Sequence, residues 1–254
     1  MLLCTDMNDL IFNYSNTDVL VTGGTSGIGQ AIAELYCQVG ANVIITGRKP
    51  SSADYGNDLK KFKYLQLDLE NKEHIHNLKQ IKQLDILVNN AGLAFPDGKS
   101  EDDPDIFDRA VNIHLNSFFR ISTLLQPKLT ASNLKGGASI IGIASMTSFF
   151  GMPLVPGYGA GKGGLVQLIK TLSMKWASEN IRVNAIAAGF IKTRMTEPVT
   201  SDKETLDPIL ERIPLRKIGD PNEIANAALF ITSPQASYIT GETLKVDGGY
   251  SIST

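Results

Sequence analysis

The chain is poor in the residues that mark several classes of protein. Its 254 residues include only two cysteines, Cys4 and Cys37, which form neither a CxxC pair nor a metal-ligand spacing. This argues against a disulfide scaffold and for two reduced thiols. No cluster of His, Cys, Asp and Glu has the spacing of a metal site, so we expect no bound metal.

Long apolar runs and an excess of one charge are also missing. No stretch approaches the roughly 18 to 20 apolar residues of a membrane span, and the N-terminus lacks the basic start of a signal peptide. Lys and Arg number 24 against 26 Asp and Glu, so nothing favours nucleic acid or an anionic membrane as a partner. We therefore expect a cytoplasmic protein with a small-molecule partner.

Short apolar segments alternate with longer amphipathic ones along the whole chain. This alternation predicts an α/β fold with a doubly wound, Rossmann-like parallel sheet covered by helices on both faces. We expect one domain over 1–254, with a short N-terminal extension at 1–16. The predicted strands are 19–22, 42–46, 62–67, 85–89, 138–144, 181–187 and 243–246, and the predicted helices 28–39, 72–80, 103–130, 158–179 and 221–232. Loops at 93–102, 146–157 and 190–215 should shape a substrate pocket, and 49–61 should form a stunted helix or a loop.

A glycine-rich loop joins the first predicted strand to the first predicted helix. It reads Thr-Gly-Gly-Thr-Ser-Gly-Ile-Gly over residues 22–29. Glycines let the backbone approach a pyrophosphate closely, and the helix N-terminus that follows favours an anion. Alone, such a loop is also typical of a simple turn that caps a helix. Its place between a strand and a helix favours a dinucleotide site.

A second motif places Tyr158 and Lys162 four residues apart, on one face of a predicted helix. A free tyrosine has a pKa of about 10 and exchanges protons poorly at neutral pH. A neighbouring ammonium should lower that pKa and make the phenol a usable acid and base. As a bare pattern, the pair also fits an ordinary surface contact on a helix.

Together these motifs resemble the short-chain dehydrogenase/reductase family in its short form. The glycine loop has the Gly-x-x-x-Gly-x-Gly spacing, the fourth strand ends in Asn-Asn-Ala-Gly at 89–92, and the similarity covers about 17–250. The resemblance implies a catalytic tetrad of Asn112, Ser145, Tyr158 and Lys162. In it, Ser145 would bond the substrate oxygen, Tyr158 would exchange the proton, and Asn112 would anchor a water linked to Lys162. His114 is expected on a helix surface or an interface.

The resemblance also implies the residues that hold the cofactor. Gly47 stands where an acid would bond the ribose hydroxyls of NAD(H), and Arg48 follows it, so we predict NADP(H) and leave NAD(H) open. Relatives have Pro-Gly where this chain has Ala188-Gly189, which leaves the path of the backbone there uncertain. The predicted cofactor contacts are Gly23, Thr25, Ser26, Gly27, Ile28, Gly29, Arg48, Asp68, Leu69, Asn90, Ala91, Gly92, Tyr158, Lys162, Gly189, Ile191 and Thr193.

The implied activity is hydride transfer between nicotinamide and a carbonyl or secondary alcohol. A 3-oxoacyl-(acyl-carrier-protein) reductase is the alternative enzyme, and Lys192, Arg194, Arg212, Arg216 and Lys217 offer some charge for an acidic carrier. A regulatory protein that only senses dinucleotide is the alternative of another class, although it would not need the tetrad. An apolar pocket wall, or equally a packed flank, is expected from Phe149, Phe150, Met152, Leu154 and Val155. The substrate itself stays open.

Two long predicted helices carry apolar residues on more than one face. Phe119 on 103–130 and Leu168 on 158–179 are examples. Helices buried on several sides need a partner, and relatives pair these two helices between subunits. We therefore expect a homotetramer, or otherwise a dimer.

Overall fold

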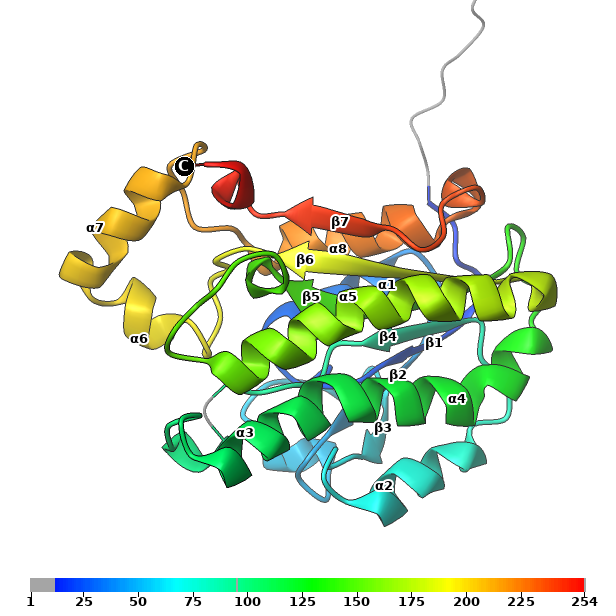
Figure 1. Ribbon diagram of the computed structural model, residues 1–254. Helices are drawn as coiled ribbons and strands as arrows, with labels where there is room; N and C mark the ends of the chain where they lie inside the picture. The colour runs from blue at the N-terminus through cyan, green and yellow to red at the C-terminus, as the bar shows by residue number, and fades with distance from the viewer. Residues whose placement is uncertain (1–11, 95, 254) are drawn as a thin grey trace, which may run out of the picture.

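The computed structural model describes residues 12–94 and 96–253, and its centre is one parallel sheet (Figure 1). The strand order is β3-β2-β1-β4-β5-β6-β7, which confirms the predicted doubly wound sheet. Chain order reverses between β1 and β4, the position at which open α/β sheets bind ligands. The strands are β1 (Asp18–Val21), β2 (Asn42–Gly47), β3 (Lys63–Gln66), β4 (Ile86–Asn89), β5 (Ala138–Ser145), β6 (Ile181–Ala188) and β7 (Thr243–Val246).

Two helical layers cover the sheet, each over its own apolar core. One layer contains α1 (Gly27–Gln38) and α8 (Pro221–Thr232), which pack with Val19, Ile45 and their neighbours. The other contains α2 (Lys72–Asn77), α4 (Ser117–Thr130) and α5 (Pro156–Trp176), which lie in front of the sheet in Figure 1. Every residue of β5 and β6 is buried, as expected for strands covered on both faces.

The connections at the carboxyl edge of the sheet differ from the expected loops. The segment 190–215 contains two helices, α6 (Glu197–Thr200) and α7 (Lys203–Arg212), which project beyond the strand ends (Figure 1). The predicted helix 103–130 is divided into α3 (Pro104–Val111), a π-helical turn at Asn112–Asn116, and α4. The segment 49–61 contains one 3-10 turn, Ser52–Asp54, as predicted for a stunted helix.

Several expectations concern the chain ends and the membrane. No helix in the described ranges is long and apolar enough to cross a bilayer. Cys37 is a free thiol, while Cys4 and most of the predicted extension 1–16 lie outside the described residues. Within that extension, Tyr14 is buried, and its hydroxyl donates to the Leu229 carbonyl at 2.6 Å. The chain before β1 is therefore attached to α8.

Candidate active site

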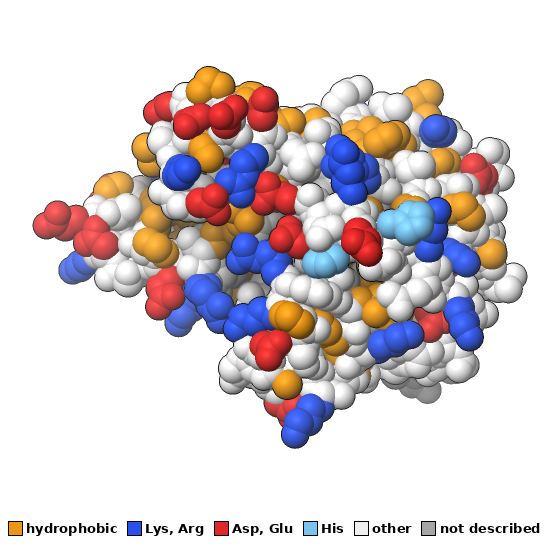
Figure 2. All heavy atoms as spheres, turned by 90° about the horizontal axis from the view of Figure 1, so that it is seen from below, with side chains coloured by type: hydrophobic (Ala, Val, Ile, Leu, Met, Phe, Trp, Pro, Cys, Tyr) orange, Lys and Arg blue, Asp and Glu red, His pale blue; other side chains and the backbone are white. Residues whose placement is uncertain are grey.

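A cavity of about 570 Å³ lies at the carboxyl ends of the strands. Every residue predicted to contact the cofactor lines it, as does Ser145. Figure 2 shows the molecule from below, with basic and acidic side chains interspersed around a hollow. Arg48, Lys49 and Arg194 are the basic residues on the cavity wall besides Lys162.

The glycine-rich loop leaves a helix N-terminus open to this cavity. Ser26 is the N-cap of α1, its side chain makes no capping bond, and the first turn carries no acid. A Cβ at Gly29 would lie 2.3 Å from Asn90 Nδ2 and 2.4 Å from the Gly23 carbonyl oxygen. Backbone N–H groups without a competing carboxylate suit a phosphate anion. The loop therefore fits the pyrophosphate of a dinucleotide.

The end of β2 has a physical reason to carry glycine. A Cβ at Gly47 would lie 2.4 Å from the hydroxyl oxygen of Tyr55, and that hydroxyl accepts a hydrogen bond from the Lys49 N–H at 3.0 Å. Tyr55 therefore occupies the space that an acidic side chain at 47 would need. Arg48 is exposed on the cavity wall, and in the described ranges no carboxylate pairs with its guanidinium.

Three predicted catalytic side chains meet at the inner end of the cavity. Ser145 ends β5, and Tyr158 and Lys162 lie in the first turns of α5. The Lys162 ammonium lies 5.6 Å from the centre of the Tyr158 ring and donates to the Ile143 carbonyl at 2.5 Å. The hydroxyl of Ser145 lies near enough to the phenol of Tyr158 to lower its pKa. The helix and the strand end thus bring a phenol, an ammonium and a hydroxyl to one place.

Burial changes the acidity of both α5 groups. Burial raises the pKa of Tyr158, the nearby hydroxyl of Ser145 lowers it, and the charge of Glu101 raises it further. The expected lowering of this pKa by Lys162 is not found. Burial lowers the pKa of Lys162 itself to about 8, because an ammonium loses its hydration inside the protein. At neutral pH the phenol is therefore protonated, as a proton donor must be.

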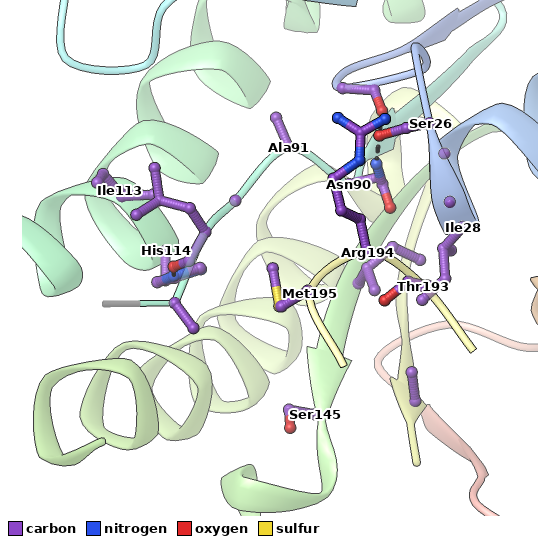
Figure 3. A pocket seen from close by; sticks show the side chains of 18 of the residues that line it. Ser26, Ile28, Asn90, Ala91, Ile113, His114, Ser145, Thr193, Arg194 and Met195 are labelled. Atoms are coloured by element: carbon purple, nitrogen blue, oxygen red, sulfur yellow. Dashed lines mark hydrogen bonds between the residues drawn. The ribbon is translucent and has the colours of Figure 1, made fainter. Parts of the chain in front are cut away.

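Asn112 does not join the other three residues. Its side-chain oxygen accepts from Arg120 at 3.0 Å, and it does not line the cavity. His114 is found beside Tyr158 instead, with ring centres 4.6 Å apart and an edge-to-face geometry. His114 is only 4% exposed, which contradicts its predicted place on a helix surface or an interface. Figure 3 shows it on the cavity wall near Ile113, with Ser145 at the end of its strand.

Helix periodicity explains this correction. One face of α3 and of the π-helical turn packs on α5, and it includes Phe107, Ala110 and His114. A Cβ added to a glycine of α5 would contact each of these three residues. Residues three and four apart share a helix face, whereas two residues apart point away from each other. Asn112 therefore faces elsewhere. The spacing of Phe107, Ala110 and His114 could have indicated His114 from the sequence.

His114 is held as a neutral ring. Its Nε2 donates to the Leu93 carbonyl at 2.7 Å, which leaves Nδ1 as an acceptor, and Nδ1 is buried with no partner among the described residues. Burial and the nearby charge of Lys162 lower the pKa of His114 to about 3, although the bond to Leu93 opposes this. The ring therefore adds no charge to the site at neutral pH.

The glycines of α5 fall into two classes. A Cβ at Gly161 would lie 2.9 Å from His114 Cβ, whereas a Cβ at Gly163 would meet only the Ser148 carbonyl at 3.9 Å. We expect Gly161→Ala to destabilise the protein by about 1 to 3 kcal/mol through overpacking. Gly163→Ala should stabilise it by about 0.5 to 1 kcal/mol, because alanine is the better helix former. Urea unfolding of both variants measures this, and equal effects would contradict it.

The remaining cavity wall was predicted only in part. Met152 and Val155 line the cavity as expected, but Phe149, Phe150 and Leu154 do not. Phe150 packs on Tyr250 instead, and Leu154 is exposed. The three loops that were predicted to shape the cavity contribute Leu93, Ala94, Met146, Phe190, Arg194 and Met195 to its lining. Further lining residues that were not predicted include Tyr55, Asn57 and His114. In Figure 3, Arg194 extends along the side of the cavity where Ser26 and Asn90 lie.

Comparison with known proteins agrees with this geometry. The sequence profile of the family described as Enoyl-(Acyl carrier protein) reductase matches residues 23–251. The chain is 36% identical to a 2-dehydro-3-deoxy-D-gluconate 5-dehydrogenase of Pseudoalteromonas atlantica, over 94% of this chain and 97% of that protein. It is 37% identical to a 3-oxoacyl-(acyl-carrier-protein) reductase of Rickettsia felis, over 91% and 95%.

A solved structure is similar along nearly its whole length. This is a gluconate 5-dehydrogenase from Burkholderia cenocepacia in complex with NADP and tartrate, with a TM-score of 0.85 and 25% identity. The similarity covers 96% of this chain and 98% of that one.

Proposed function

Because the chain belongs to the short-chain dehydrogenase/reductase family and is an oxidoreductase acting on CH–OH groups, we propose that it transfers hydride between NADP(H) and a carbonyl or secondary alcohol, with Tyr158 as acid and base. The observation that carries this proposal is the meeting of Ser145, Tyr158 and Lys162 at the inner end of a cavity that fits a dinucleotide. A regulatory protein that only binds dinucleotide would not need these three groups together.

The roles follow from the position and charge of each group. A nicotinamide held in this cavity would supply or accept the hydride. During reduction, negative charge develops on the carbonyl oxygen, and Ser145 stabilises it by donating a hydrogen bond. Tyr158 gives its proton to the same oxygen, and its raised pKa means that the proton is present at neutral pH. The ammonium of Lys162 lies 5.6 Å from the centre of the ring and places a positive charge beside the phenol.

We further propose that His114 supports Tyr158 in this site, while the role of Asn112 as the anchor of a water stays a prediction. The edge-to-face contact of its ring limits rotation of the Tyr158 ring, and its bond to Leu93 ties the pair to the end of β4. Because the ring is neutral, it supports Tyr158 without repelling Lys162.

The cofactor preference depends on the end of β2, since relatives include both NADP-bound and NAD-dependent enzymes. Tyr55 fills the space of the acid that would bond the ribose hydroxyls. The guanidinium of Arg48 could instead grip a 2′-phosphate with charge-assisted bonds. These two features favour NADP(H).

We expect Arg48→Ala to raise the KM for NADPH relative to that for NADH by about tenfold. A hydrogen bond to a charged group contributes about 1.5 to 3 kcal/mol, and solvent screening at this exposed site favours the lower end. Steady-state kinetics with both cofactors measure the ratio. Lys63→Ala, an exposed change outside the cavity, is the control. An unchanged ratio in Arg48→Ala would contradict NADP(H) preference.

We propose a small substrate rather than a carrier-bound acyl chain. Of the basic residues considered for an acidic carrier, Arg212 donates to the Tyr250 hydroxyl and Lys217 pairs with Glu223 at 2.6 Å. The charge of Lys217 is therefore paired within the chain, whereas Arg212 bonds a neutral hydroxyl. Relatives named for gluconate derivatives make hydroxy acids and their ketones the first class to test.

The test of the function is NADPH consumption across a panel of ketones, including keto derivatives of sugar acids and a 3-oxoacyl thioester. Turnover with a small ketone is expected. Turnover with the thioester alone would favour the carrier-protein reductase, and tight NADPH binding without turnover would favour the sensing protein.

We also propose that the chain assembles as a homotetramer or dimer through α4 and α5. Much of the apolar surface of these helices is buried in the chain's own core, for example Phe118 and Trp176, but Phe119 on α4 and Met174 on α5 remain exposed. Sedimentation equilibrium tests this, and a stable active monomer would refute it.

A further inference from the structure

A buried carboxylate lies at the N-terminus of α5, the helix that carries Tyr158 and Lys162. Glu101 is 1% exposed, although it belongs to the connection between β4 and α3. Its Oε2 accepts a hydrogen bond from the backbone N–H of Tyr158 at 2.8 Å. Its Oε1 is buried with no partner among the described residues. An acid is rarely buried so completely unless it is paired or has a function.

The carboxylate replaces a cap that α5 lacks. The N-cap residue of α5 is Val155, whose side chain cannot accept a hydrogen bond, and no acid lies in the first turn. The first N–H groups of a helix need acceptors and favour a negative charge. Glu101 supplies both from 57 residues away in the sequence. It therefore connects the 93–103 segment to the turn that carries Tyr158.

The same segment reaches the cavity. Leu93 and Ala94 line the wall, and the Leu93 carbonyl accepts from His114. Tyr158 thus faces Ser145 of β5, Lys162 of its own helix, His114 of the π-helical turn and Glu101 of this segment. Among these neighbours, Glu101 is the only acid.

We infer that Glu101 is a positioning residue for Tyr158, which fixes the first turn of α5 by its hydrogen bond and places a negative charge at the backbone of the residue that carries the phenol. This inference rests on the proposed function, since it gives the protonated form of Tyr158 a use in carbonyl reduction. A negative charge beside a phenol disfavours the phenolate. The charge of Glu101 therefore favours the protonated form of Tyr158, which is the form that carbonyl reduction uses.

The experiment separates charge from hydrogen bonding. Glu101→Gln keeps an acceptor for the Tyr158 N–H but removes the charge. Its Tyr158 should ionise at lower pH than in the wild type. Phenolate absorbance is titrated in the ultraviolet for each protein and for its Tyr158→Phe counterpart, because the difference isolates one of the seven tyrosines. For alcohol oxidation with NADP⁺, the rising limb of kcat/KM should move to lower pH by the same amount.

Asp102→Asn is the matched control. Asp102 is the neighbouring acid on the same segment, but it is exposed and bonds Ser100. Its replacement should therefore shift neither the Tyr158 titration nor the pH profile of kcat/KM. Glu101→Ala removes charge and acceptor together, and should add a higher substrate KM to the same shift.

Two results would overturn the inference. The first is an unshifted Tyr158 titration in Glu101→Gln. The second is a shift of equal size in Asp102→Asn. The absorbance titration needs no substrate, so a wild-type enzyme inactive on every ketone would refute the proposed function and still leave Glu101 testable.

Discussion

Tyr158→Phe is expected to lower kcat for carbonyl reduction by a factor of about 10² or more. A positioned proton donor contributes roughly 10² to 10⁴ in rate, and the variant removes the hydroxyl group while keeping the ring. The phenylalanine ring retains the edge-to-face contact with His114 at 4.6 Å, so the fold should be unaffected. The affinity for NADPH, measured by fluorescence titration, should change little, because the cofactor is held along the whole cavity.

The control for this variant is Tyr238→Phe, the same change at a fully exposed tyrosine, which should leave kcat unaltered. Near-normal turnover by Tyr158→Phe would remove Tyr158 from the mechanism. A large loss of NADPH affinity in that variant would instead point to a binding role for the hydroxyl.

The second large effect is a decrease in the free energy of unfolding at acid pH, which arises from His114. Its pKa is lowered from 6.5 to about 3 in the folded protein, so between these values the unfolded chain binds more protons than the native one. Stability from this group is present above pH 6.5 and is lost as the pH falls toward 3. The slope is about 1.4 kcal/mol per pH unit. At pH 4.5 the loss relative to pH 7 is about 3 kcal/mol.

Urea unfolding at pH 7 and pH 4.5, at one protein concentration, measures this loss. His114→Asn removes the titrating ring and should reduce the difference between the two pH values by about 3 kcal/mol. His76→Asn, a change of an exposed histidine on α2, should not reduce it. The same pH dependence in wild type and His114→Asn would show that His114 is not buried in its neutral form.

Local sequence patterns were enough to predict much of the fold and part of the site. The alternation of apolar runs predicted the strands of the parallel sheet, because buried strands and amphipathic helices differ in period. The glycine-rich loop at 22–29 depends on neighbours in sequence, as does the pairing of Tyr158 with Lys162 on one helix face. Such features follow from backbone geometry over a few residues, so the chain alone was enough to predict them.

Which side chains complete the site was decided by contacts between distant segments. Asn112 and His114 are two residues apart, and only the packing of the π-helical turn on α5 brings His114 to Tyr158. Glu101 reaches the Tyr158 N–H across 57 residues. The raised pKa of Tyr158 follows mainly from burial, whereas the sequence suggested a lowered one from Lys162. Desolvation and long-range charge depend on everything that surrounds a group, and that environment exists only in the folded chain.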